Sequence, residues 1–167
     1  MSGLIAEEKA VALLEACRRK SITLATAESC TGGLIAASLT DIGGSSDVFD
    51  RSFVTYSNEA KHEMLGVPTE LIEQYGAVSE QVALAMAAGV IAHSRAGIAI
   101  SVTGIAGPGG GSQQKPVGLV WFGLALKGQP PIAARHIFED RGRASIRMAA
   151  VNVALDMALS ALEAKNA

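Results

Sequence analysis

The chain has 167 residues, 49% of them apolar and 4% aromatic, and a formal net charge of −2 at pH 7. Its length and composition predict a single globular domain, residues 1–167, that buries a core without metal or disulfide cross-links. The near-neutral charge and the scarcity of aromatic residues argue against nucleic acid or an anionic membrane as a partner.

The chain contains two cysteines, Cys17 and Cys30, and starts without the pattern of a signal peptide. These features predict a reduced, cytoplasmic protein. No apolar run approaches the roughly 18 residues that a membrane span needs. The cysteines and the three histidines also lack the spacing of metal ligands, so neither a metal nor a cofactor is expected.

The first half of the chain predicts helices that alternate with two strands. Apolar periodicity and turn residues indicate a helix over 4–19, a strand over 22–26, a helix to about 40, a strand over 52–56, a helix to Leu65, a short helix from Thr69 that Gly76 ends, and a helix over 80–93. Ser57 or Asn58, and Ser79, are placed to cap the helices that follow them. Gly66 fits the position just after a helix end.

The second half predicts a buried strand over 97–103, a glycine-rich loop over 104–112, a hairpin of strands over 117–126 and 132–138, and a closing helix from about 144. Strands that alternate with helices, followed by a hairpin and a helix, are typical of α/β proteins. The expected fold is therefore a three-layer α/β/α sandwich with a mixed central sheet of about five strands. Because Gly and Ala are abundant, we expect the helices to lie close to the sheet, with small residues at the contacts.

Residues 25–33, Ala-Thr-Ala-Glu-Ser-Cys-Thr-Gly-Gly, lie where the first predicted strand turns into a helix. Such a turn directs free backbone N–H groups and the positive end of the helix dipole at one point. A nucleophile held there can attack a carbonyl whose developing negative charge falls on those N–H groups. Ser29 and Cys30 compete for this role, since a thiol at a helix N-terminus is the stronger nucleophile. The alternatives are an ordinary Ser/Thr N-cap and a small buried apolar cysteine.

A serine nucleophile needs a base, and the three histidines fall in predicted helices or in a strand whose partners the sequence does not identify. Lys61 lies one helical turn beyond the second predicted strand. If that strand lies beside the first, Tyr56 and Lys61 open onto the same end of the sheet as Ser29. Burial would then lower the pKa of the lysine toward the range of a base. The alternative is a solvated lysine on a helix surface.

The glycine-rich loop over 104–112 offers a row of backbone N–H groups that suits a phosphate. It lacks the Lys-Ser/Thr ending of a P-loop, and its spacing differs from the dinucleotide fingerprint. Arg141 and Arg143, at the start of the last helix, can clamp a phosphate with their guanidinium groups. An ordinary glycine turn and a solvated basic cluster are the alternatives.

Five blocks of the chain resemble one known family. They are Thr26-Ala-Glu-Ser-Cys-Thr-Gly-Gly33, Phe53-Val-Thr-Tyr-Ser-Asn-Glu-Ala-Lys61, Tyr75-Gly-Ala-Val-Ser79, Val102-Thr-Gly-Ile-Ala-Gly-Pro108 and Lys115-Pro-Val-Gly118. In this order they cover nearly the whole chain and are similar to the CinA C-terminal domain family, which includes nicotinamide-nucleotide amidases. Larger members carry a further N-terminal domain, so the chain looks like the standalone form.

The resemblance implies deamidation of nicotinamide mononucleotide to nicotinate mononucleotide and ammonia, by a serine nucleophile and without a metal. Carried over to this chain, Ser29 would attack the amide carbon. Lys61 would take the serine proton and help to deliver one to the leaving ammonia. Tyr56 would hydrogen-bond within this relay. The oxyanion donors that we infer beside them are N–H groups around Thr31, Gly32 and Gly33.

Ribose and phosphate would be held by Thr103 and the glycines that follow it, Gly104 and Gly107, with one arginine of the last block. We favour Arg143 for this role, because Arg147 then lies four residues on, as in the family pattern, and Arg141 is second. The chain departs from many members at Gln113-Gln114, where acidic residues are common. This difference changes the charge of the loop rather than the chemistry.

A second hypothesis is a non-catalytic pyridine-nucleotide-binding or regulatory module of the competence/damage-inducible CinA type. It would use the same glycine loop and arginine without turnover, so ammonia release separates the two hypotheses. Both take a small molecule, nicotinamide mononucleotide or a relative of it, as the partner. A homo-oligomer is left open, since small residues on helix faces suit subunit packing and an intramolecular core equally well.

Overall fold

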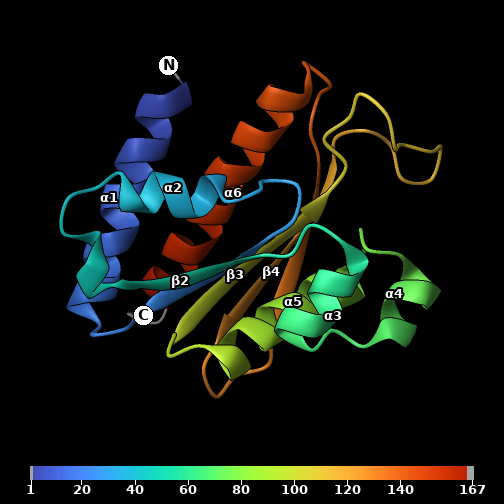
Figure 1. Cartoon of the computed structure of the whole chain (residues 1–167). Helices are drawn as coiled ribbons and strands as arrows, with labels where there is room; N and C mark the ends of the chain where they lie inside the picture. The colour runs from blue at the N-terminus through green and yellow to red at the C-terminus, as the bar shows by residue number, and fades with distance from the viewer. Residues whose placement is uncertain (1, 165–167) are drawn as a thin grey trace.

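The structure, a computed structural model, describes residues 2–164, with side chains from residue 6 onward. Five strands form one sheet in the order β2-β1-β3-β4-β5 (Figure 1). They are β1 (Leu24–Glu28), β2 (Phe49–Val54), β3 (Ile98–Gly104), β4 (Leu119–Leu126) and β5 (Ile132–Ile137). β1 pairs in parallel with β2 and β3, whereas β4 is antiparallel to both of its neighbours. The expected mixed sheet of five strands is confirmed.

Helices cover both faces of this sheet, and each face has its own apolar core. One layer holds α1 (Ser2–Arg19), α2 (Leu34–Thr40) and α6 (Arg143–Ala164); the other holds α3 (Asn58–Leu65), α4 (Thr69–Tyr75) and α5 (Glu80–His93) (Figure 1). A short 3-10 helix, Ser45–Asp47, precedes β2. This arrangement is the predicted three-layer α/β/α sandwich.

Small residues on the sheet let α5 approach it closely, as the composition predicted. Ala25, Ala27 and Ala99 belong to the apolar cluster that α5 covers. A Cβ atom added to Gly123 of β4 would lie 2.3 Å from the carbonyl oxygen of Ala83, inside α5. Any larger residue at this position of β4 would therefore push the helix away from the sheet.

Signals at the helix ends were read correctly from the sequence. The Ser57 side chain accepts a hydrogen bond from Ala60 N–H at 3.0 Å and caps α3. Ser79 caps α5 in the same way. Gly66 ends α3 in the left-handed region, with φ 71°, which glycine adopts without a steric cost.

The two strands that lead to the predicted site have different bounds from those expected. β1 covers Leu24–Glu28 rather than 22–26, and β2 covers Phe49–Val54 rather than 52–56. The strands pair until Glu28 lies opposite Val54, and Thr55 N–H still donates to the Glu28 carbonyl at 3.0 Å. Pairing with a neighbour therefore sets these ends more than the apolar pattern of either strand. As a result, Tyr56 lies beyond β2.

α6 corrects the expectation that no segment approaches a membrane span. By length and composition alone this helix could cross a membrane, with a mean hydropathy of 1.3. It packs against α1, α2, β3 and β4. Its buried residues are Ile146, Ala150, Val151, Ala154, Leu155, Ala158 and Leu162. The core helix of an α/β domain meets the same criteria, so the hydropathy of α6 is weak evidence for a span.

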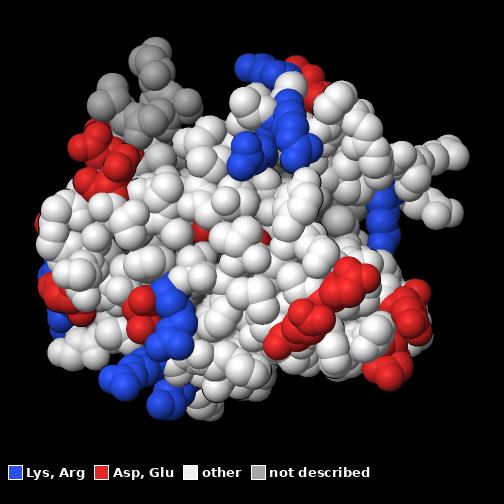
Figure 2. Space-filling view, in the orientation of Figure 1, with Lys and Arg blue, Asp and Glu red and all other residues white. Residues whose placement is uncertain are grey.

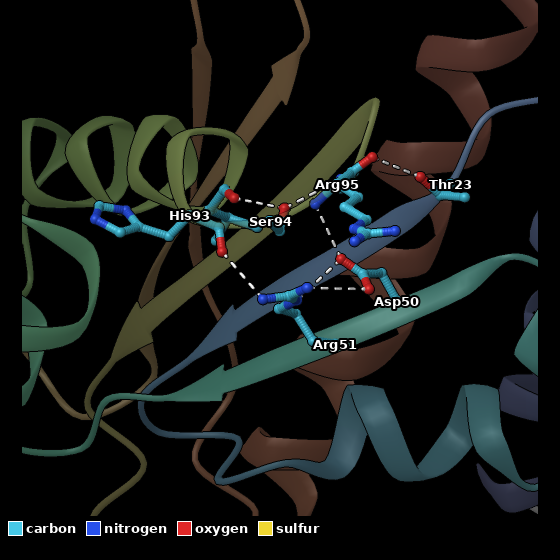
Figure 3. Close-up of polar contacts among 8 residues, drawn as sticks. Thr23, Asp50, Arg51, His93, Ser94 and Arg95 are labelled. Carbon is cyan, nitrogen blue, oxygen red and sulfur yellow. Dashed lines mark hydrogen bonds and ion pairs between the residues drawn. The ribbon is translucent and has the colours of Figure 1, made fainter.

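Polar contacts fasten the elements at the amino ends of the parallel strands (Figure 3). The Asp50 carboxylate accepts from Arg95 N–H at 3.0 Å and from Arg51 Nε at 2.9 Å. Arg51 also donates to the His93 carbonyl, and the Thr23 hydroxyl donates to the Arg95 carbonyl. These contacts join the turn between α5 and β3 to both β1 and β2. The opposite, carboxyl ends of the strands carry the candidate chemistry.

Candidate active site

A cavity of about 190 Å³ lies at the carboxyl ends of β1, β2 and β3. In an open α/β sheet this is where ligands commonly bind, because the loops that follow the strands converge there. The cavity is lined by residues that the sequence singled out, namely Ser29, Cys30, Tyr56, Lys61, Thr103, Gly104 and Arg143, and also by Asn58. Among the described residues, no three His, Cys, Asp or Glu side chains are grouped to hold a metal ion.

Ser29 is the first residue after β1, in a tight turn that leads to α2. Its N–H donates to the Val102 carbonyl at 3.0 Å, and its own carbonyl accepts from Gly32 N–H at 3.0 Å. Gly32 and Gly33 have φ values of 56° and 100°, which residues with side chains rarely adopt. The Gly-Gly pair therefore allows the chain to turn tightly enough to hold Ser29 at the cavity.

The buried Glu28 carboxylate organises this turn, a role that sequence reasoning missed. Its side chain is fully buried, and every hydrogen-bond partner can donate to it. The donors are the hydroxyls of Thr26 (3.3 Å), Thr31 (2.7 Å) and Ser52 (3.2 Å) and the N–H groups of Gly33 (3.2 Å), Ile35 (2.9 Å) and Ala36 (3.0 Å). A carboxylate has about four lone-pair sites, so these six donors share them, and the long contact from Thr26 is secondary to its 2.7 Å hydrogen bond to Ser52. An acidic residue just before a helix start was the available signal.

These contacts use N–H groups that the sequence analysis expected to be oxyanion donors. Gly33 N–H already donates to Glu28, and Gly32 N–H already donates to the Ser29 carbonyl. The N-terminus of α2 is thus occupied by an internal anion, and two of the three expected donors have acceptors. Thr31 is fully buried, with its hydroxyl on Glu28.

Arg147 holds the same turn from the side of α6. Its Nε atom donates to the Cys30 carbonyl at 3.0 Å, and Nη2 donates to the Thr31 carbonyl at 3.2 Å. The turn is therefore bound through its N–H groups by Glu28 and through its carbonyl groups by Arg147. The sequence analysis predicted no role for Arg147 and used it only to match Arg143 to the family pattern.

Lys61 reaches Ser29 from the neighbouring strand connection. Its side chain is 1% exposed, and Nζ lies 3.1 Å from Ser29 Oγ, 2.9 Å from the Thr55 carbonyl oxygen and 3.3 Å from the Tyr56 carbonyl oxygen. α3 starts just beyond β2, so its first turn places Lys61 over the end of β1. The structure brings the two residues together as the parallel arrangement of their strands led us to expect.

Burial affects the two possible reactive groups beside Ser29 in opposite ways. Desolvation lowers the pKa of Lys61, because the charged ammonium loses its water. Burial raises the pKa of the Cys30 thiol to about 11. Cys30 is 5% exposed and stays a neutral thiol near pH 7. Burial therefore disfavours the charged forms of both groups, the Lys61 ammonium and the Cys30 thiolate.

Tyr56 departs from its expected place in the relay. Its side chain is 64% exposed, and its hydroxyl accepts a hydrogen bond from Arg143 Nη2 at 3.2 Å. Only its main-chain carbonyl contacts Lys61. Tyr56 lines the cavity together with Ser29, but its hydroxyl meets Arg143 rather than Lys61. The phenol is therefore not bonded to the Ser29–Lys61 pair among the described residues.

The predicted phosphate residues separate into two groups. Arg143 lines the cavity and donates to the Gly107 carbonyl at 2.7 Å, which joins α6 to the glycine-rich loop. Thr103 and Gly104 also line it, and the Thr103 hydroxyl donates to the Ala77 carbonyl at 2.8 Å. Arg141 is exposed and pairs with Glu139 at 2.7 Å. Of the two arginines, only Arg143 is at the cavity.

The surface around the site is divided by charge. Basic side chains gather at the top of Figure 2, where the first turns of α6 lie in Figure 1. Acidic side chains follow α3 and α4, which carry Glu59, Glu63, Glu70 and Glu73. An anionic group of a ligand would therefore be directed to the end of the site that Arg143 occupies.

Curated relatives share most of this chain. It is 52% identical over 159 residues to the nicotinamide-nucleotide amidohydrolase PncC of Enterobacter agglomerans, covering 95% of this chain and 96% of that protein. It is 50% identical over 141 residues to the protein of the same name from Escherichia coli strain K12, covering 84% and 85% of the two chains. A putative competence-damage inducible protein of Caldicellulosiruptor bescii is 54% identical over 121 residues, which are 29% of that longer protein.

Solved structures share the fold closely. The competence/damage inducible protein CihA of Agrobacterium tumefaciens superimposes with a TM-score of 0.92 at 50% identity, covering 95% of this chain and 96% of that one. The competence damage-inducible protein A of Klebsiella pneumoniae gives a TM-score of 0.90 at 35% identity, with 95% and 97% coverage. The model of the CinA C-terminal domain matches residues 6–162, so this chain belongs to the CinA C-terminal domain family.

Proposed function

We propose that this chain hydrolyses the carboxamide of nicotinamide mononucleotide to nicotinate mononucleotide and ammonia, with Ser29 as the nucleophile and Lys61 as the base. The observation that carries the mechanism is the 3.1 Å contact between Lys61 Nζ and Ser29 Oγ at the cavity. The substrate is supported by relatives named nicotinamide-nucleotide amidohydrolase, which are about 50% identical over most of the chain.

The contacts of Lys61 suit a neutral amine that acts as a base. A neutral amine has two N–H bonds and one lone pair. The carbonyl oxygens of Thr55 and Tyr56 can accept hydrogen bonds from the two N–H groups of this amine. Its lone pair is then directed at the Ser29 hydroxyl. Burying a lysine beside neutral groups costs free energy, so a purely binding module would have little reason to keep it there.

The reaction then follows in two stages. Ser29 Oγ bonds to the amide carbon while its proton passes to Lys61, and a tetrahedral intermediate forms. Lys61 returns the proton to the amide nitrogen, the C–N bond breaks, and ammonia leaves an acyl ester on Ser29. Lys61 next takes a proton from a water molecule that attacks this ester, and returns it to Ser29 Oγ as nicotinate mononucleotide leaves.

The oxyanion needs donors that the turn has not already used. Gly32 N–H donates to the Ser29 carbonyl and Gly33 N–H to Glu28, whereas no hydrogen bond from Cys30 N–H to another residue is found among the described residues. Cys30 lines the cavity and follows the nucleophile directly. In α/β-hydrolases the N–H of the residue after the nucleophile is an oxyanion donor. We therefore assign one oxyanion donor to Cys30 N–H.

Removing the nucleophile tests the proposal most directly. We expect wild-type protein to release ammonia from nicotinamide mononucleotide, and Ser29→Ala to lose on the order of 10⁶ in kcat, as when a serine hydrolase loses its nucleophile. Lys61→Met, which fills a similar volume without a base, should be similarly inactive. Cys30→Ala is the matched control and should keep activity within about tenfold. Turnover by Ser29→Ala at the wild-type rate would refute the mechanism.

The pH profile tests the role of Lys61. Only the neutral amine accepts a proton, so kcat should rise with pH as Lys61 deprotonates. Because burial lowers its pKa, the midpoint should lie below the ordinary lysine value of 10.5. Steady-state ammonia release across the pH range measures this midpoint. A rate that falls with rising pH over the same range would assign activity to the charged ammonium instead.

The two arginines give a matched pair for the phosphate. Arg143→Ala should raise KM for nicotinamide mononucleotide by about 10- to 100-fold, since a hydrogen bond to a charged group contributes about 1.5–3 kcal/mol. Arg141→Ala should change KM less than about twofold, because this exposed side chain pairs with Glu139 away from the cavity. The corresponding riboside, which lacks the phosphate, should be insensitive to Arg141→Ala and lose less than the nucleotide with Arg143→Ala, which also removes the contacts to Gly107 and Tyr56. Equal effects of Arg143→Ala on nucleotide and riboside would exclude a phosphate contact.

Glu28→Gln tests whether the carboxylate positions the nucleophile. The amide keeps the shape but turns an NH₂ group toward N–H and hydroxyl donors, so the turn that carries Ser29 must shift. We expect kcat to fall about 10- to 100-fold with KM nearly unchanged and the thermal midpoint lowered. Ser52→Ala removes one donor on β2 without touching the turn, and should leave kcat within about threefold. Full kcat in Glu28→Gln would show that the charge is dispensable for positioning.

A further inference from the structure

The charges around the cavity leave one part of the proposed substrate unmatched. Nicotinamide mononucleotide carries an anionic phosphate and a cationic pyridinium ring. Among the described residues that line the cavity, Lys61 and Arg143 are basic and none is acidic. Arg143 can match the phosphate, but no lining carboxylate matches the ring. Any inference about how the ring is recognised rests on the proposed substrate.

Tyr56 is the one aromatic residue among those that line the cavity. At 64% exposure its ring is not part of the core, so its faces are open to a ligand. The faces of an aromatic ring carry partial negative charge and attract cations, most strongly where water is excluded. Tyr56 is therefore the lining residue with a group that can favour a pyridinium ring.

The contacts of Tyr56 place its ring between the two ends of the site. Its main-chain carbonyl lies 3.3 Å from Lys61 Nζ, and its hydroxyl lies 3.2 Å from Arg143 Nη2. The amide of the substrate must lie at Ser29, beside Lys61, and its phosphate at Arg143. The pyridine and ribose rings span this same distance, so the Tyr56 ring borders their path.

We propose that Tyr56 determines specificity by placing its aromatic face against the pyridinium ring, and so selects the cationic, oxidised ring over a neutral one. The hydrogen bond from Arg143 fixes the phenol in this orientation. The hydroxyl does not move a proton in the reaction. The bound pyridinium in turn disfavours a second positive charge nearby, which helps to keep Lys61 neutral and able to act as a base.

The experiment compares a cationic with a neutral ligand of nearly the same shape. The ligands are nicotinamide mononucleotide and its reduced, dihydropyridine form, titrated calorimetrically into full-length Ser29→Ala protein so that neither is hydrolysed. Tyr56→Phe keeps the aromatic face, and Tyr56→Leu removes it. Both variants lose the hydrogen bond between the Tyr56 hydroxyl and Arg143. Because the two ligands carry the same phosphate, a change in phosphate binding alters both affinities equally. It therefore cancels in the ratio of the affinity for the cationic ligand to that for the neutral ligand.

Ser29→Ala protein should bind the cationic ligand more tightly than the neutral one. Tyr56→Leu should weaken binding of the cationic ligand about 5- to 30-fold and of the neutral one less than about threefold, in line with typical cation–π strengths. Tyr56→Phe should keep the preference.

Two results would overturn the inference. One is an equal loss for both ligands in Tyr56→Leu, which would make the ring a plain apolar wall. The other is a large loss of kcat in Tyr56→Phe with unchanged binding, which would restore a relay role. Failure of the proposed function looks different: wild-type protein would then release no ammonia, while the preference for the cationic ligand and its loss in Tyr56→Leu would still uphold the inference.

Discussion

The buried Glu28 carboxylate is the constraint on which the rest of the site depends. It accepts hydrogen bonds from β1, from β2 and from the first turn of α2, and so joins three segments that meet at the end of the sheet. An anion at a helix N-terminus is favourable, but here it is internal, and it uses the N–H groups that a substrate would otherwise meet. The turn that carries the proposed nucleophile, Ser29, is therefore held by hydrogen bonds, and the N–H groups of Gly32 and Gly33 are already used.

α6 joins this turn to the substrate end of the cavity. Arg143 and Arg147 lie four residues apart and so share one face of the helix. Arg147 binds the carbonyls of the nucleophile turn, and Arg143 binds Gly107 and the hydroxyl of Tyr56. Chain segments far apart in sequence are thus held by two side chains of one element. A ligand phosphate at Arg143 would act on the same helix that steadies Ser29.

Features set by local sequence were predictable, and so was one tertiary contact that follows from strand order, whereas the other tertiary contacts were not. The caps at Ser57 and Ser79 depend on neighbours in the chain, and parallel strands with adjacent ends led to Lys61 beside Ser29. The ends of β1 and β2 depend on their pairing, which no single strand encodes. The partners of Glu28 come from three elements, and the direction of the Tyr56 ring depends on Arg143, 87 residues further along the chain.

The separation of the two buried charges explains how Lys61 can serve as a base. Glu28 is surrounded by its own donors, and it is not among the groups that shift the pKa of Lys61. If the carboxylate paired with the lysine, the ammonium form would be stabilised and the base lost. Lys61 instead meets two carbonyls and a hydroxyl, which can satisfy a neutral amine. In the proposed mechanism, Glu28 holds the turn that carries Ser29, and because its own donors surround it, it does not stabilise the charged form of Lys61.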